Sequence, residues 1–229
     1  MPSSKLQKHL LNAIKPHVPL NGWSEVAFRA AISDADMDEG IALAICPRRA
    51  FDLALAFHEE GDWEMLDRLA ETDLSDMRFR DRIATAVRYR LEVIENRELV
   101  RRSAALFSLP PNVPEGAQVI WNTCDKIWAA LGDQSNDINW YTKRSMLSAV
   151  YGSTTLYWLG DESVKYEKTW AFLDRRIADV MRFEKIKAKV RENPFMKTFA
   201  NGPLSALGRM CMPPRRNRSG MPGSWNRPE

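Results

Sequence analysis

Few side chains in this sequence are of the types and spacings that perform acid–base, nucleophilic or metal chemistry. The three histidines, His9, His17 and His58, share no His-x-x-x-His or Glu-x-x-His spacing, so they predict neither a zinc site nor a di-iron site. No glycine-rich phosphate loop and no Gly-x-Ser-x-Gly nucleophile turn occurs. The run His58-Glu59-Glu60 predicts a solvated helix face. We therefore expect no enzyme, metal or cofactor, and a protein that works by binding; an active site assembled from distant residues is the alternative.

The cysteines and the start of the chain bear on the compartment. Cys46, Cys124 and Cys211 are odd in number and far apart, which suits a reducing compartment and argues against a disulfide or zinc site. No run of eighteen apolar residues occurs, and residues 1–17 have neither a signal core nor the composition of a transit peptide. We expect a cytoplasmic protein with ordinary, apolar cysteines.

Charge is placed unevenly along the 229 residues, whose formal net charge is +3. The segment 185–218 has nine basic residues against one acid, Glu192, so the residues before it are net negative. Residues 213–229 are rich in Pro, Gly, Arg, Asn and Ser and have too little apolar surface to offset the entropy of ordering. We expect an acidic folded body, a basic segment and a disordered tail.

The elements that must position any site are helices. Apolar residues recur at helical spacing, and alternating β-branched runs are nearly absent. We therefore predict an all-α bundle of about nine helices. Their approximate bounds are Leu6–Ile14, Ser24–Ala31, Asp36–Ile45, Pro47–Thr72, Asp76–Leu91, Arg97–Leu109, Pro114–Leu131, Asp137–Leu159 and Ser163–Phe183.

The second and third predicted helices have the dimensions of a helix-turn-helix, which makes DNA binding an alternative function. A recognition helix uses Lys or Arg to neutralise phosphates. The segment Ser33–Ile45 has no basic residue and four acids: Asp34, Asp36, Asp38 and Glu39. We therefore favour a structural remnant of a helix-turn-helix over the unit of a transcription repressor.

One stretch is distinctive enough to compare with a known family. It reads GDQSNDINWYTKR at residues 132–144, continues to Tyr151, and occurs with GWS at 22–24, LPPNVP at 109–114 and TWAFL at 169–173. This set resembles the ubiquinone (coenzyme Q) biosynthesis accessory protein known as the ninth Coq protein. The match is ordered along the chain and covers roughly residues 6–181.

The resemblance implies a fold like that of the TetR repressors, a homodimer, a pocket for isoprenoid lipids and no catalysis. It also implies a partner, the di-iron hydroxylase that acts on demethoxyubiquinone, to which the protein presents a quinone precursor at the membrane. A C-terminal amphipathic helix contacts lipid in that family. Here Pro194 and Pro203 interrupt any single long helix, which leaves the mode of contact open.

The central motif supplies four candidate residues for docking a partner protein. On a helix, Asp137, Tyr141 and Arg144 have i, i+4, i+7 spacing, and Trp140 is adjacent. Trp, Tyr and Arg bury large areas while keeping polar groups, so they recur as interface anchors. We expect Arg144 to be an exposed charge. In the alternative, Trp140 begins a core stripe that continues through Leu147, Tyr151, Thr154 and Trp158.

Two further sets have candidate roles in the helical body. A stripe of small residues after Tyr141 predicts close helix packing in a dimer: Ser145, Ser148, Gly152 and Thr155. The candidate lipid-binding residues are Leu106, Val119, Ile127, Met146, Val150 and Tyr157. Ordinary core packing is the alternative for this second set.

The basic segment has the composition of a membrane-contact surface. Each cation near an anionic bilayer contributes on the order of 1 kcal/mol, and bulky apolar groups add to this by insertion. The candidate membrane residues are Lys185, Lys187, Lys189, Arg191, Phe195, Lys197, Phe199, Leu204 and Leu207. We expect peripheral attachment to an anionic surface, the inner face of the cytoplasmic membrane, with nucleic acid as the alternative ligand.

These patterns divide the chain into four predicted parts. Residues 1–46 form the helix-turn-helix-like part, and residues 47–184 form the lipid-binding and dimerisation body. Residues 185–212 form the basic amphipathic segment, and residues 213–229 form the tail.

Overall fold

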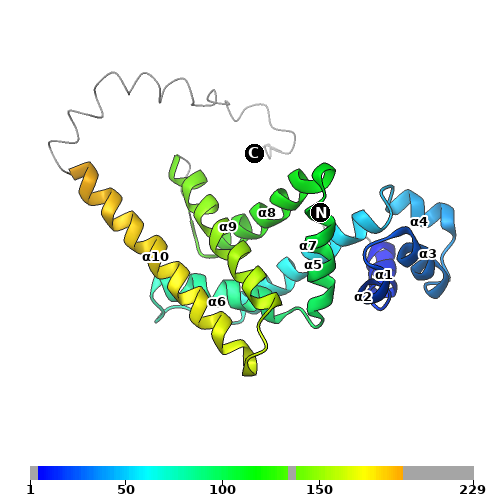
Figure 1. The fold of residues 1–229 in the computed structure, drawn as a ribbon, viewed down its shortest axis with the longest axis horizontal. Coiled ribbons are helices and arrows are strands. Elements are labelled where there is room, and N and C mark those ends of the chain that lie inside the picture. Colours follow the sequence, from blue (N-terminus) through cyan, green and yellow to red (C-terminus); the bar gives the residue numbers. More distant parts are fainter. Residues whose placement is uncertain (1–4, 134–137, 193–229) are drawn as a thin grey trace, which may run out of the picture. The chain divides into compact units, whose positions relative to one another are not determined.

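The computed structural model describes residues 5–133 and 138–192; for residues 138, 139 and 183–192 it describes the backbone alone (Figure 1). These residues form α-helices and two short 3₁₀ helices, with no strand among them, which confirms the predicted all-α fold. The chain divides into two units, residues 1–180 and 181–229. The elements are α1 (Lys5–Ile14), α2 (Val18–Asn21), α3 (Glu25–Asp34), α4 (Glu39–Ile45), α5 (Ala50–Ala70), α6 (Phe79–Glu92), α7 (Arg97–Phe107), η1 (Pro110–Asn112), α8 (Val113–Ala130), α9 (Ile138–Leu159), η2 (Val164–Tyr166) and α10 (Glu167–Glu192).

Helices α1 to α4 form the N-terminal part of the first unit. Leu10 and Ile14 of α1 are buried because the apolar residues of this helix recur on one face. The Ser24 side chain accepts a hydrogen bond from the backbone N–H of Ala27 (3.3 Å), so the predicted N-cap of α3 is confirmed.

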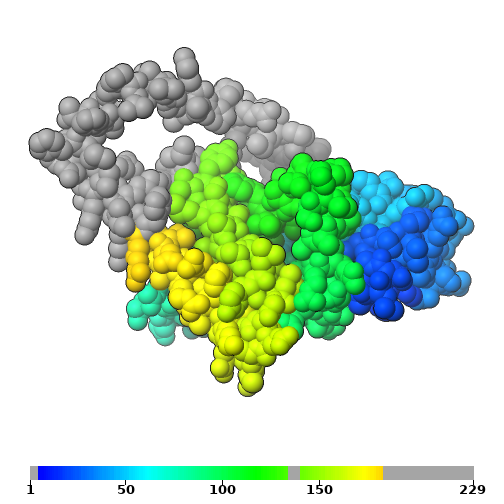
Figure 2. Space-filling model, in the orientation of Figure 1, coloured from blue at the N-terminus to red at the C-terminus, as the bar shows by residue number. Residues whose placement is uncertain are grey.

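Trp23 and the short helix α2 join this part to α7. The indole N–H of Trp23 donates to the carbonyl of Leu99 (3.2 Å), and Arg102 donates to the carbonyl of Pro19 (2.9 Å). The space-filling view shows the N-terminal residues, in blue, beside green ones (Figure 2), and α2 packs against α7. The GWS motif therefore has a structural role at this junction.

Helix α5 packs against α1, α6 and α8 and is the central helix of the unit. Its buried side chains include Leu53 and Met65. Gly61 lies where a side chain of α6 approaches: a Cβ at this position would lie 2.8 Å from Nη1 of Arg90. Any larger residue would displace the guanidinium, so this close approach requires glycine.

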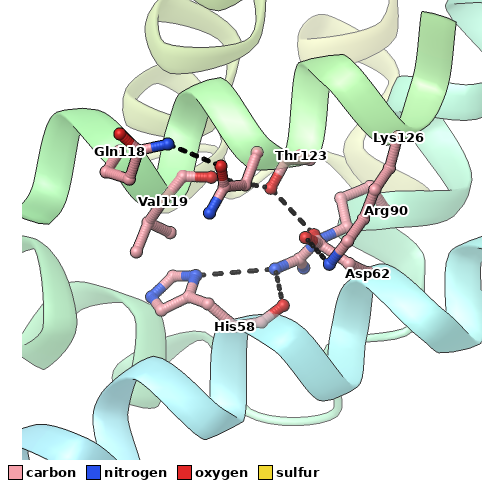
Figure 3. Close-up of polar contacts among 8 residues, drawn as sticks. His58, Asp62, Arg90, Gln118, Val119, Thr123 and Lys126 are labelled. Atoms are coloured by element: carbon pink, nitrogen blue, oxygen red, sulfur yellow. Dashed lines mark hydrogen bonds and ion pairs between the residues drawn. The ribbon is translucent and has the colours of Figure 1, made fainter. Parts of the chain in front are cut away.

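A buried ion pair joins α5, α6 and α8 (Figure 3). Nε of Arg90 donates to Oδ1 of Asp62 (2.7 Å), and the two side chains are 1% and 4% exposed. Thr123 donates to the same oxygen (2.8 Å), and Lys126 donates to Oδ2 (2.9 Å). Nη2 of Arg90 donates to the carbonyl of His58 (3.0 Å). These hydrogen bonds offset the cost of removing both charges from water.

Asp161 holds the turn between α9 and α10. It accepts hydrogen bonds from the backbone N–H groups of Ser163 (2.8 Å) and Thr169 (2.9 Å) and from the Thr169 hydroxyl (2.6 Å). Burial raises the pKa of Asp161, but the hydrogen bonds from Thr169 and Ser163 outweigh burial and hold the pKa well below its usual value. Arg97 donates to the carbonyls of Trp158 (3.1 Å) and Asp161 (2.6 Å), so it satisfies the end of α9.

The predicted starts of α4 and α5 were wrong. Helix α4 begins after Asp38, because Asp36 has a positive φ of 46° and the Asp38 side chain accepts from the backbone N–H of Ile41 (3.1 Å). Helix α5 begins after Arg49 rather than at Pro47, because Arg49 has a φ of 55°. A left-handed residue interrupts a right-handed helix in both places.

The predicted starts of α6 and α10 were also wrong. Arg78, not Asp76, occupies the N-cap position of α6. Helix α10 begins after Tyr166 because Lys165 and Tyr166 have positive φ values of 50° and 59°. Its backbone continues past Phe183, where the prediction ended it.

We expect Arg90→Met to lower the free energy of unfolding by about 3–5 kcal/mol, because Asp62 would keep its charge in the interior without its guanidinium partner. Urea unfolding followed by circular dichroism measures this. Arg29→Met is the matched control: Arg29 pairs with Glu25 in an exposed i, i+4 bridge (2.9 Å), whose loss changes stability by at most about 1 kcal/mol. Equal unfolding midpoints for the two variants would contradict the central role of the buried pair.

Candidate functional site

Three aromatic side chains gather where α8 packs against α9. The ring centroids of Trp121 and Trp140 lie 5.7 Å apart, and those of Trp140 and Tyr141 lie 4.8 Å apart, edge to face. Trp121 and Trp140 are half-buried, whereas Tyr141 is 62% exposed. This aromatic cluster (Trp121, Trp140, Tyr141) has the large apolar area and polar tip of an interface anchor.

Arg144 supports the aromatic cluster from the protein interior. Its Nε donates to Asp125 (2.5 Å) and its Nη1 to Asp133 (3.1 Å). Its guanidinium carbon lies 4.0 Å from the ring centroid of Trp140, a cation–π contact. The side chain is only 3% exposed, so the expectation of an exposed charge was wrong. The two carboxylates and the indole hold it inside.

The other residues of the motif have mixed outcomes. Asp137 lies outside the described residues. The stripe that follows Trp140 on α9 is buried, which confirms the alternative of core packing for these residues: Leu147, Tyr151, Thr154 and Trp158. The candidate docking residues therefore reduce to those at the start of α9 and the facing part of α8.

The six candidate lipid-binding residues lie in different environments. Ile127 and Val150 belong to the buried core. Tyr157 is 38% exposed, and its ring stacks on that of Phe172 with centroids 4.6 Å apart. Three are half-buried: Leu106, Val119 and Met146. Core packing accounts for Ile127 and Val150, and a lipid pocket formed by the set stays a prediction.

The candidate dimer and membrane surfaces also stay predictions. On the small-residue stripe of α9, Ser145 is exposed, and the other three residues are half-buried: Ser148, Gly152 and Thr155. The backbone at Lys185, Lys187, Lys189 and Arg191 is helical, and their side chains lie outside the described part. Phe195, Lys197, Phe199, Leu204 and Leu207 lie outside the described residues altogether.

A cleft that the sequence did not predict lies between α5 and α8. It has a volume of about 360 Å³, and its lining includes His58, Glu59, Asp62, Glu115, Asp125 and Lys126. His58 to Glu60 are half-buried, so the predicted solvated face was wrong. The available signal was the i, i+4 pair of His58 and Asp62 beside Gly61, three polar or small residues inside an otherwise apolar helix face.

The described cysteines are chemically quiet. Burial raises the pKa of Cys46 to about 11 and that of Cys124 to about 12, so both remain protonated thiols at neutral pH. Among the residues that the structure describes, no three His, Cys, Asp or Glu side chains are grouped to hold a metal ion. None of the described helices is long and apolar enough to cross a membrane.

The region of the aromatic cluster matches a known family. Residues 113–184 match the family model described as COQ9. The human protein named "Ubiquinone biosynthesis protein COQ9, mitochondrial" is 31% identical over 189 residues, which cover 77% of this chain and 58% of the human protein. The chain is therefore similar to the COQ9 family. The "Probable ubiquinone biosynthesis protein coq9, mitochondrial" of Dictyostelium discoideum is 29% identical over 193 residues, which cover 81% of this chain and 62% of the relative.

The chain thus spans less than two thirds of the length of these two relatives, whose names place them in mitochondria. A solved structure extends the comparison to the fold. The TetR transcriptional regulator from Nitrosomonas europaea superposes with a TM-score of 0.63, at 16% identity, over 76% of this chain and 97% of the regulator. This confirms the predicted TetR-like fold.

We expect substitutions at the motif residues Arg144 and Tyr141 to have different effects on the free energy of unfolding. Arg144→Met should lower the free energy of unfolding by about 3–5 kcal/mol, because Asp133, itself 4% exposed, would lose a buried partner. Tyr141→Ala should change it by at most about 1 kcal/mol, because the side chain is 62% exposed. Thermal and urea unfolding measure both. A larger loss for Tyr141→Ala would mean that Tyr141 is a core residue.

Proposed function

We propose that this chain is a non-catalytic accessory protein of ubiquinone biosynthesis. It binds an isoprenoid quinone precursor and presents it, as a homodimer, to the di-iron demethoxyubiquinone hydroxylase at a membrane. The observation that carries the proposal is the exposed Tyr141 of the aromatic cluster, inside the residues that match the COQ9 family model. The names of the human and Dictyostelium relatives support the pathway.

The geometry of the aromatic cluster supports docking of a protein. Trp140 is fixed from below by the guanidinium of Arg144, and Trp121 fixes it from α8. A rigid aromatic anchor loses little side-chain entropy when it binds, so more of the contact free energy appears as affinity. We therefore expect Tyr141 to contribute most to the free energy of binding a partner.

Exposed apolar residues near the end of α9 support binding of a lipid or of a second subunit. Leu156 is 67% exposed, Tyr157 is 38% exposed, and Val164 in η2 is 75% exposed. Exposed apolar groups that gather on a soluble domain are typical of a surface that another apolar molecule covers. Both the lipid and the homodimer of the proposal require such a surface.

A DNA-binding regulator of the TetR type is the alternative function, but the charge of the helix-turn-helix opposes it. Asp34 pairs with His17 (2.7 Å), and Asp38 caps α4. Arg29, a nearby cation, already pairs with Glu25. The segment 33–45 contains four acidic and no basic side chains, so it would repel a phosphate backbone. The likeness to the Nitrosomonas europaea regulator extends to the fold alone.

The test is co-purification of the full chain with the demethoxyubiquinone hydroxylase. We expect Tyr141→Ala to weaken the complex by roughly 1–4 kcal/mol, as truncation of an interface anchor does. Trp63→Ala is the control, because Trp63 is also an exposed aromatic residue, at 44%, and lies on α5. Extraction of the purified complex with organic solvent, followed by mass spectrometry, should yield an isoprenoid quinone precursor.

Three outcomes would each overturn a part of the proposal. Equal binding by Tyr141→Ala and wild type, with both folded, would remove the aromatic cluster from the interface. Extracts that contain no isoprenoid compound would remove lipid presentation. Sedimentation of the wild type as a monomer at micromolar concentration would remove the homodimer.

We further propose that the basic segment 185–212 attaches the protein peripherally to an anionic membrane. The relatives are named as mitochondrial, and their names do not specify a membrane. Replacing Lys185, Lys187, Lys189 and Arg191 by Gln in the full chain should reduce flotation with anionic liposomes at least about tenfold, because each cation contributes on the order of 1 kcal/mol. Replacing Lys5 and Lys8 of α1 by Gln is the control. Unchanged flotation of the first variant would place the membrane surface elsewhere.

A further inference from the structure

The cleft between α5 and α8 contains a buried hydrogen-bond donor without a partner. His58 lines this cleft, and its Nε2 is buried and makes no hydrogen bond with the protein. Figure 3 shows the ring between the two helices, with its other nitrogen toward Arg90. A buried polar atom of this kind costs free energy unless a ligand or solvent satisfies it.

Arg90 fixes which ring nitrogen of His58 carries the proton. Nη2 of Arg90 lies 3.5 Å from Nδ1 of His58. A guanidinium only donates hydrogen bonds, so Nδ1 must be the acceptor and the proton of the neutral ring must lie on Nε2. Burial and then the charge of Arg90 lower the pKa of His58 to about 3, so the ring is neutral at physiological pH. The cleft therefore presents an N–H donor that a ligand with an acceptor oxygen would satisfy.

The surrounding charges select an uncharged ligand. Four carboxylates line the cleft against one ammonium group, so an anion is repelled at its mouth: Glu59, Asp62, Glu115 and Asp125 against Lys126. A cation is disfavoured at the inner end, because Nε2 of His58 presents a proton there and the buried guanidinium of Arg90 lies behind the ring. Asp62 already accepts hydrogen bonds from Arg90, Thr123 and Lys126, so its charge is compensated within the protein.

The rest of the lining offers acceptors and apolar walls. Gln118 donates to Oδ1 of Asn122 (2.7 Å), which leaves the carbonyl oxygen of Gln118 to accept. Glu115, 41% exposed, is a second acceptor near the mouth. Leu55 from α5 and Val119 from α8 are the apolar walls. A ligand that fits has one acceptor oxygen, one donor and an apolar body, and a phenol combines these features.

We propose that the cleft between α5 and α8 binds a small uncharged phenol, whose oxygen accepts a hydrogen bond from Nε2 of His58 and whose hydroxyl donates to Gln118 or Glu115. The site is separate from the aromatic cluster and from the exposed apolar residues of α9. It does not depend on the proposed function, because a chain that binds neither hydroxylase nor isoprenoid lipid would still have this donor, these charges and these walls.

The test is titration of the full chain with phenol, anisole and toluene, followed by calorimetry and by the ¹⁵N shift of Nε2 of His58. Phenol offers a donor and an acceptor, anisole an acceptor alone, and toluene neither. We expect phenol to bind about tenfold more tightly than toluene, with anisole between them, because each net hydrogen bond is worth up to about a factor of ten in affinity. Phenol and anisole, which both offer an acceptor oxygen, should shift the Nε2 resonance, and toluene should not.

Two variants sharpen the result. His58→Phe removes the donor and should lower the affinity for phenol several-fold and bring that for anisole down to that for toluene, whereas His9→Phe, a change at an exposed histidine of α1, should leave both unchanged. If His58→Phe fails to fold, the order of the three probes and the Nε2 shift in the wild type decide the question alone. Equal affinity for phenol and toluene would overturn the proposal. Tighter binding of benzylammonium than of phenol would also overturn it and assign the cleft to an organic cation.

Discussion

The ion pair between Asp62 and Arg90 is the constraint on which the rest of the first unit depends. A charge placed in the interior must be paired and hydrogen-bonded, so the sequence around each partner is fixed by the other. Gly61 leaves room for the guanidinium, and Thr123 and Lys126 complete the shell of Asp62. The polar contacts thereby fix the positions of α5, α6 and α8 relative to one another. Apolar packing alone is less directional and would fix these positions less sharply.

The same arrangement links the cleft to the aromatic cluster through one helix. Asp125 lines the cleft and accepts a hydrogen bond from Arg144, the residue that supports Trp140. Lys126, the next residue, bonds Asp62 on the other side of the cleft. Substitutions at Asp125 would therefore disturb both surfaces, whereas Tyr141 and His58 each belong to one surface and report on it separately.

The sequence predicted the helices well and the polar interior poorly, and the reason is physical. Apolar periodicity and local caps such as Ser24 act over a few residues, so a pattern read along the chain detects them. Asp62 and Arg90 are 28 positions apart, and nothing in either local sequence indicates that they meet. Arg144 was expected at the surface because isolated arginines usually lie there; the carboxylates of Asp125 and Asp133 that draw it inside lie on the preceding helix and its end.

The N-terminal helices show why a shared fold does not carry a shared function. Packing requires only that the apolar faces of α1, α3 and α4 meet, and Leu10, Ala31 and Ala42 fulfil this while the outer residues remain free to change. DNA binding requires cations on the outer face, where this chain has Asp34 and Asp36. The buried residues thus preserve the TetR-like arrangement. The exposed acidic residues lack the positive charge that DNA binding requires. The surfaces that retain specific chemistry, the aromatic cluster and the cleft, both lie on the part built around α8.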